Sequence, residues 1–327
     1  MSAFKTFLVS SLAIGAGLCN PVPAGRAQNH PTAAEAEAAV PATGGSIKPP
    51  AGFTKVVFLD DFSKAKAGSQ PSKAKWTYDL GIGYPGGATN WGTGEIQHYT
   101  ADKENIAIVD GALRITPVKK GEKWTSARIE TTASQDFTCP PGKKLRIEAS
   151  IKIPASDPST QMGIWPAFWS MGSAFRNNVT SWPAIGELDV LEVSNGSPQV
   201  FHTAHCGVVN GGPCEEKNGK GSGATYTRGK WTKFAIDVDR TSKDWKAEKL
   251  VWSVDGKPTF TLTGQQVGDA KAWAPLTSTP KMILLNVAVG GEFPNAKAGK
   301  GVVTPNAKTV GGPQSAMDVK YVAAFTS

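Results

Sequence analysis

Three carboxylates lie within six residues of each other in the segment 186–192 (GELDVLE), with aliphatic residues in the gaps. This aliphatic content predicts a buried or half-buried strand, where ionised acids are rarely placed. Crowded carboxylates repel one another, so we expect at least one to keep its proton near neutral pH. An ionised carboxylate beside a protonated one is the pair that cleaves glycosidic bonds. Glu187, Asp189 and Glu192 are therefore candidate catalytic residues.

The spacing of these acids departs from strand alternation. Glu187 and Asp189 share a face, but the next residue of that face is Leu191, and the third acid is Glu192. Either Glu192 points to the opposite face, or an extra residue bulges out near Val190 and returns Glu192 to the face of Glu187. We favour the bulge because it brings the acids together and sends the aliphatic side chains inward. A solvated acidic strand is the alternative, but the intervening residues are too apolar for it.

The elements that must position these acids read as short strands. Beyond Thr54, apolar runs are separated by glycine, proline, asparagine and serine, and no long amphipathic helix is indicated. The expected strands are Lys55–Leu59, Ile106–Val109, Ala112–Pro117, Leu145–Ile153, Leu188–Val193, Lys233–Val238, Leu250–Val254, Thr259–Leu262, Lys281–Val289 and Lys320–Phe325. The pair Asp255-Gly256 predicts a tight hairpin. The pattern predicts an all-β fold in which two curved antiparallel sheets stack around a groove.

The N-terminal region has the features of an export signal. Lys5 precedes an apolar run, Phe7–Leu18, that is too short to span a bilayer, and we expect residues 1–27 to be a signal peptide. Residues 28–51 are rich in alanine and proline and predict a linker or pro-segment. One catalytic domain is expected over residues 52–327. No later apolar stretch suits a transmembrane helix, so the expected product is secreted and extracellular.

The cysteines predict one disulfide bond. Cys206 and Cys214 flank a turn-rich loop that a disulfide could close, which leaves Cys139 unpaired. A zinc site that adds His202 and His205 is the alternative. Its spacing fits no usual ligand pattern, and export favours disulfides.

The charge pattern of the chain argues against a nucleic-acid partner, and the lack of a transmembrane stretch argues against a membrane partner. The formal net charge is +8, but the lysines are scattered and no arginine-rich stripe alternates with aromatic residues. We expect a soluble monomer whose basic surface suits acidic wall material.

Tryptophans cluster in the sequence around the acidic strand. Trp165 and Trp169 have the same parity, so in an extended segment they face one way. An indole face suits the C–H face of a pyranose ring, and its N–H can bind a hydroxyl. Core packing is the alternative for any one of them, but Trp91 and Trp182 add to the group and favour sugar platforms.

Two further side chains are candidates for substrate binding. Arg128 could clamp a hydroxyl or orient a carboxylate, or it could be an ordinary surface charge. His205 follows the acidic strand by one loop and either lines the cleft or is a structural histidine.

These residues resemble a known family. The pattern Glu187-x-Asp189-x-x-Glu192 resembles the E-x-D-x-x-E signature of glycoside hydrolase family 16, in the longer, bulged form typical of laminarinase-type endo-β-1,3(4)-glucanases. Further matches are residues 94–99 (GEIQHY), 165–169 (WPAFW), 285–291 (LNVAVGG) and 313–321 (PQSAMDVKY). The resemblance covers nearly all of the chain beyond the predicted linker. The chain differs from the family pattern at Thr93 and Gly94, where members often carry paired asparagines.

The resemblance implies a β-jelly-roll with a sugar cleft on its concave face. It also implies a retaining double displacement in which Glu187 is the nucleophile, Glu192 is the acid/base and Asp189 hydrogen-bonds the nucleophile. No cofactor is implied for catalysis. Some members bind a structural calcium, and Asp318 lies near where one ligand would fall.

The same resemblance implies that Trp165, Trp169, Arg128 and His205 lie near the sugar subsites. The implied partner is a β-glucan polysaccharide. Among substrates, β-1,3-glucan is favoured, mixed β-1,3/1,4-glucan comes second, and galactans are a further alternative. A cell-wall transglycosylase with the same acids and a non-catalytic β-glucan-binding lectin are the alternative functions.

Overall fold

The computed structural model describes residues 47–327. The predicted signal peptide (1–27) and residues 28–46 of the predicted linker lie outside the described residues. Within residues 47–327, no helix has the length and apolar character needed to cross a membrane.

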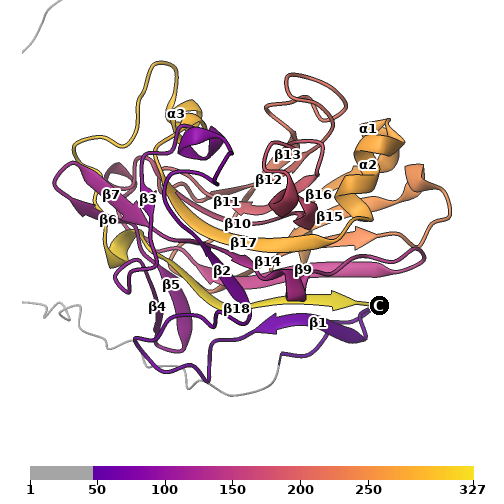
Figure 1. The fold of residues 1–327 in the computed structure, drawn as a ribbon, viewed down its shortest axis with the longest axis horizontal. Coiled ribbons are helices and arrows are strands. Elements are labelled where there is room, and N and C mark those ends of the chain that lie inside the picture. Colours follow the sequence, from indigo (N-terminus) through magenta and orange to yellow (C-terminus); the bar gives the residue numbers. More distant parts are fainter. Residues whose placement is uncertain (1–46) are drawn as a thin grey trace, which may run out of the picture. The chain divides into compact units, whose positions relative to one another are not determined.

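Two curved antiparallel sheets form the predicted β-jelly-roll sandwich (Figure 1). The eight-stranded sheet has the order β16 (Lys257–Thr263), β15 (Lys249–Val254), β14 (Thr232–Asp239), β9 (Lys144–Lys152), β18 (Met317–Thr326), β5 (Ala112–Ile115) and β4 (Ile106–Val109), and β1 (Lys55–Asp60) also pairs with β18. The seven-stranded sheet has the order β13 (Lys220–Thr225), β12 (Gln199–His205), β11 (Glu187–Glu192), β10 (Ile164–Gly172), β17 (Lys281–Val289), β8 (Arg128–Thr131) and β2 (Trp76–Asp79).

The remaining elements are short. A three-stranded sheet outside the two predicted antiparallel sheets contains β3 (His98–Tyr99), β7 (Lys123–Ser126) and β6 (Val118–Lys120), and its β3–β7 pair is parallel. The α-helices are α1 (Gly264–Val267), α2 (Ala270–Thr277) and α3 (Glu292–Ala298). The 3₁₀ turns are Thr89–Gly92, Ala133–Gln135, Pro158–Thr160, Ser173–Asn177, Trp245–Ala247 and Pro313–Ser315. The described part therefore contains no long amphipathic helix, as predicted.

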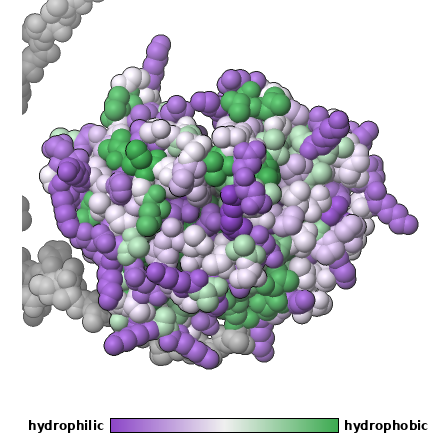
Figure 2. Space-filling view, viewed as in Figure 1, coloured by the Kyte–Doolittle hydropathy of each residue, from purple (hydrophilic) through white to green (hydrophobic). Residues whose placement is uncertain are grey.

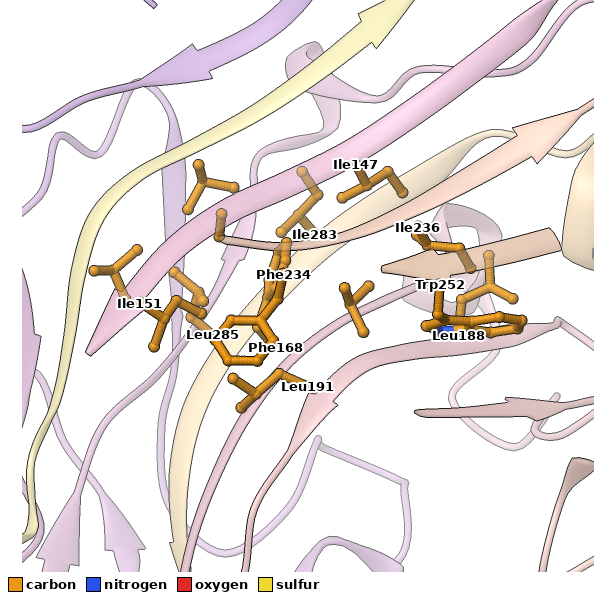
Figure 3. Close-up of a cluster of buried hydrophobic side chains, with 14 of the residues drawn as sticks. Ile147, Ile151, Phe168, Leu188, Leu191, Phe234, Ile236, Trp252, Ile283 and Leu285 are labelled. Atoms are coloured by element: carbon orange, nitrogen blue, oxygen red, sulfur yellow. The ribbon is translucent and has the colours of Figure 1, made fainter. Parts of the chain in front are cut away.

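The core lies between the two large sheets (Figure 3). Leu188 and Leu191 of β11 point into it and meet side chains of the opposite sheet such as Phe234, Ile236 and Trp252. Each fully buried side chain of this size contributes roughly 1.5–3 kcal/mol relative to exposure. One face of β11 is therefore committed to the core.

The surface is mainly polar. Hydrophilic residues cover much of the face in Figure 2, interrupted by separate hydrophobic patches. Large apolar side chains that stay exposed among the described residues include Val208 and Val209 in one loop and Val302 and Val303 in another.

Two turns adopt left-handed backbone conformations that matter for the fold. At the predicted hairpin between β15 and β16, Asp255 has φ 48° and Gly256 has φ 77°, as a two-residue turn of this kind requires. Gly186 has φ 78° and leads directly into β11. A Cβ at Gly186 would lie 2.7 Å from the backbone of Pro275, whereas a Cβ at Gly256 would meet nothing within 4 Å.

We predict that Gly186→Ala destabilises the protein more than Gly256→Ala does. Both variants bear the left-handed conformational cost of about 1–2 kcal/mol, but only Gly186→Ala also forces a backbone contact, worth roughly 1–3 kcal/mol more. Urea denaturation of the two variants measures this difference in the free energy of unfolding. Equal losses in both variants would contradict the contact with Pro275.

Candidate active site

β11 contains the predicted bulge. In its pairing with β10, consecutive residues of β10 lie opposite Asp189 and Leu191, so Val190 is the extra residue. The register with β12 shifts over the same stretch. As a result Glu187, Asp189 and Glu192 all line one cleft, while the aliphatic residues between them join the core.

Two buried donors hold the backbone of the bulge. The indole Nε1 of Trp252 donates to the carbonyl oxygen of Asp189 at 2.7 Å, and Nδ1 of His202 lies 2.8 Å from the carbonyl oxygen of Val190. Burial lowers the pKa of His202 to about 4, so the ring is neutral. Its Nδ1–H then donates to the carbonyl, and its Nε2 accepts from the hydroxyl of Thr259 at 3.0 Å. Consecutive carbonyls of the bulge are thus satisfied from the core side.

The cleft above this strand has a volume of about 840 Å³. All members of the predicted tryptophan cluster line it, namely Trp91, Trp165, Trp169 and Trp182. Further lining comes from α3 and from the segment 217–223, which includes the start of β13.

The acids of the cleft retain protons. Burial first, and then the charge of Asp189, raises the pKa of Glu187 to about 8 and raises the pKa of Glu192 well above its ordinary value. The positive charge of His205 lowers both pKa values but only partly offsets this rise. Both shifts favour the protonated form at neutral pH, in agreement with the expectation that at least one of these crowded acids keeps its proton.

His205 lies between two carboxylates. Its Nε2 is 3.4 Å from Oδ2 of Asp189, and its Nδ1 is 2.7 Å from Oε2 of Glu216. Burial would lower the pKa of His205, but the negative charge of Asp189 and the hydrogen bond to Glu216 outweigh it and hold that pKa well above its ordinary value. The ring is consequently an imidazolium that lines the cleft.

The N–H groups of the two predicted sugar platforms are already bound by the protein. Nε1 of Trp165 donates to Oε1 of Glu192 at 3.1 Å, and Nε1 of Trp169 donates to Oδ1 of Asn286 at 2.8 Å. Both rings line the cleft, with 8% and 9% of their surface exposed. Their nitrogens therefore orient neighbouring side chains and are not free for a sugar hydroxyl.

Arg128 is buried behind the aromatic wall of the cleft. Its Nε donates to Oδ2 of Asp79 at 3.0 Å and its Nη2 donates to the hydroxyl of Tyr84 at 3.0 Å. The guanidinium carbon lies 4.4 Å from the ring centroid of Trp91 and 4.8 Å from that of Trp169. The surface-charge alternative is wrong, and the carboxylate that Arg128 orients is that of Asp79.

Some cleft residues were not assigned from the sequence. Glu95 is buried and accepts hydrogen bonds from Thr93 at 2.8 Å, Gln97 at 2.7 Å and Tyr99 at 2.9 Å. In the sequence, the run of hydrogen-bonding residues around Glu95 could have indicated its role. Asn286 also lines the cleft, but it lies in the mainly apolar strand β17 and had no such signal. Glu216, a loop residue that contacts His205 and does not itself line the cleft, had none either.

The surroundings of Asp318 do not fit a calcium ion. Its carboxylate accepts hydrogen bonds from Arg114 at 2.6 and 2.9 Å, and Lys152 Nζ lies 3.6 Å away. Both of its oxygens therefore already face cations rather than a site for Ca²⁺.

One other group of the described residues has the right types for metal binding. Glu187, Asp189 and His205 offer atoms within 4.8 Å of one another. His205 lies between the carboxylates of Asp189 and Glu216 at 3.4 and 2.7 Å, so this group forms an acid cluster with an internal cation.

The predicted disulfide is present. Cys206 and Cys214 are bonded with a Cα–Cα distance of 5.3 Å, and Cys139 is free and buried. The zinc alternative is wrong because neither of these bonded sulfurs is available as a thiolate.

We predict that Glu187→Gln stabilises the folded protein increasingly as the pH rises from about 4.5 to about 8. In the unfolded chain Glu187 ionises near its ordinary pKa of 4.5, whereas in the folded protein it keeps its proton up to about 8. Folding of the wild type therefore takes up a proton and weakens across this interval, and the loss levels off above it. Glutamine carries no such cost.

The measurement is the difference in Tm between Glu187→Gln and wild type at pH 5 and at pH 8. Glu122→Gln, which changes an exposed glutamate, is the matched control and should show no pH-dependent difference. A difference in Tm that is the same at both pH values would contradict the raised pKa.

Comparison with known proteins agrees with this geometry. Residues 97–243 match a family described as "XgeA-like, catalytic GH16 domain". The chain is 28% identical over 291 residues to the Glucan endo-1,3-beta-glucosidase A1 of Niallia circulans, a match that covers 83% of this chain and only 37% of that protein. It is 27% identical over 246 residues to the Beta-glucanase of Rhodothermus marinus, covering 73% of this chain and 77% of that protein.

Among solved structures, the endo-1,3-beta-glucanase from Streptomyces sioyaensis is 39% identical and superimposes with a TM-score of 0.79. That match covers 86% of this chain and 99% of the Streptomyces chain. On this evidence the chain belongs to glycoside hydrolase family 16.

Proposed function

We propose that this protein is a retaining endo-glycosidase that hydrolyses β-1,3-glucan or mixed β-1,3/1,4-glucan. The observation that carries the proposal is the meeting of Glu187, Asp189 and Glu192 on one side of a tryptophan-lined cleft. The names of the Niallia, Rhodothermus and Streptomyces relatives support the substrate class, since each is the name of a β-glucan hydrolase.

In the proposed reaction Glu187 acts in its ionised form, which the positive charge of His205 favours. One of its carboxylate oxygens attacks the anomeric carbon while the proton of Glu192 passes to the leaving oxygen. A covalent glycosyl-enzyme results. Water then attacks the same carbon, gives its proton to Glu192 and releases Glu187. Asp189 tunes the nucleophile, and the Trp165 N–H holds Glu192 in position.

The proposal extends to substrate binding. Trp165, Trp169 and Trp91 form apolar cleft walls for sugar rings. Arg128 supports Trp91 and Trp169 from behind, and His205 faces the reacting sugar beside Asp189. We propose that the protein acts as a monomer without a cofactor.

We also propose that the protein is secreted. The apolar run after Lys5 and a buried disulfide support export, because disulfides persist in oxidising compartments.

The first test of this function removes the proposed catalytic acids. Glu187→Gln and Glu192→Gln should each lower kcat on laminarin by about 10²–10⁴-fold, since each loses a nucleophile or an acid that acts in the transition state. Circular dichroism should show an unchanged fold, and Glu122→Gln should keep wild-type activity. Activity within a few-fold of wild type in either cleft variant would overturn the assignment.

The second test identifies linkage and reaction type. Laminarin, barley glucan, lichenan and agarose are digested side by side, and we expect reducing ends from laminarin and the mixed-linkage glucans but not from agarose. Proton NMR should show a first product of β configuration, which is retention. Longer oligomers from a short donor would favour transglycosylation, α products would exclude retention, and no reducing ends from any glucan would favour a lectin.

A further inference from the structure

A buried carboxylate, that of Glu216, lies behind the proposed catalytic acids. Glu216, in the loop after β12, has a fully buried side chain, with 0% exposed. Its Oε2 lies 2.7 Å from Nδ1 of His205, and its Oε1 accepts the backbone N–H of Cys206 at 2.9 Å. A buried carboxylate is costly unless it is paired and hydrogen-bonded. Both oxygens of Glu216 meet this need on the segment that carries His205.

His205 links Glu216 to the catalytic strand. The residue is the cross-strand partner of Glu187, and its Nε2 faces Oδ2 of Asp189 at 3.4 Å. The ring of Trp182 lies 5.6 Å from the imidazole ring, centroid to centroid, and so walls it on one side. With a carboxylate at each nitrogen, the ring holds a proton on both and stays oriented toward Asp189.

The disulfide holds this arrangement together. Cys206 directly follows His205, and its bonded partner Cys214 lies two residues before Glu216. Backbone hydrogen bonds of 2.6 and 2.8 Å also join Gly211 and Glu216 across the loop. The disulfide and these backbone hydrogen bonds therefore both restrain the loop that carries Glu216.

From this geometry we infer that Glu216 is a positioning residue for the proposed hydrolysis, acting through His205 and held in place by the Cys206–Cys214 disulfide. The charged groups that face His205 are Glu187, Asp189 and Glu192 of β11 and Glu216 of the loop. The charge of Glu216 stabilises the protonated ring of His205 and holds it beside these acids. The positive ring in turn favours the ionised form of Glu187, which a nucleophile needs. The inference rests on the proposed function.

The kinetic test compares two neighbouring substitutions. Glu216→Gln preserves shape but removes the charge, and should lower kcat on laminarin by about 10–100-fold with KM changed less than about threefold, because a misplaced group beside the reacting atoms affects the transition state most. Glu215→Gln is the matched control, since the Glu215 side chain is 68% exposed and, within residues 47–327, forms an ion pair only with Lys220. It should leave kcat unchanged.

A titration of His205 gives a readout that does not need hydrolysis. The chain has only four histidines, so the His205 signals in a ¹⁵N-labelled NMR spectrum are identified by their loss in His205→Gln. In the wild type and in Glu215→Gln the ring should stay doubly protonated to high pH. In Glu216→Gln its pKa should fall, since the cation loses a negative partner.

The disulfide is tested with the double variant Cys206→Ser/Cys214→Ser, whose folded fraction is checked by thermal unfolding. Folded molecules should show the reduced kcat of Glu216→Gln, and full kcat would overturn the anchoring role of the disulfide. An unchanged His205 pKa in Glu216→Gln, or a kcat within twofold of wild type, would overturn the positioning role. If the wild type itself cleaves no glucan, the proposed function fails, and the titration still decides whether Glu216 controls His205.

Discussion

A strand that belongs to the core can present its acids on one face only if its alternation is broken once. Val190 is that break, and without it the carboxylate of Glu192 would point among the buried side chains between the sheets, where an unpaired charge is strongly disfavoured. The opposite sheet contributes directly, because Trp252 of β15 donates to the carbonyl of Asp189. The bulge at Val190 thus directs the aliphatic side chains of β11 into the core and its acids into the cleft.

The negative charge gathered by β11 is offset by two buried cations of similar design. Arg128 stands behind the tryptophan wall with the carboxylate of Asp79, and His205 stands beside Asp189 with the carboxylate of Glu216. In each case the carboxylate farther from the cleft orients the cation and stabilises its charge. These two pairs explain how a folded protein tolerates the acids on β11.

The sequence predicted features that depend on local pattern. The expected strands, the Asp255-Gly256 hairpin, the bulge and the disulfide are all present. The strands that were not predicted are β2, β3, β6, β7, β8, β10, β12 and β13. Among them, β10 is buried on both faces and shows no alternation, and β13 is rich in glycine. Glu216 and His202 went unassigned because their importance arises from partners brought close by loop closure and sheet stacking. Such long-range contacts produce no periodic pattern in the amino-acid sequence, so they could not be predicted from it.

The pairing of β1 with β18 gives the domain a nearly closed topology. Lys55 lies opposite Thr326 in that ladder, on the eight-stranded sheet rather than the sheet that carries the acids. A short peptide joining these neighbouring positions would convert the domain into a backbone ring with little distortion. New ends opened at the exposed Gly121 turn between β6 and β7 would then yield a circular permutant with the order of its strands in space preserved.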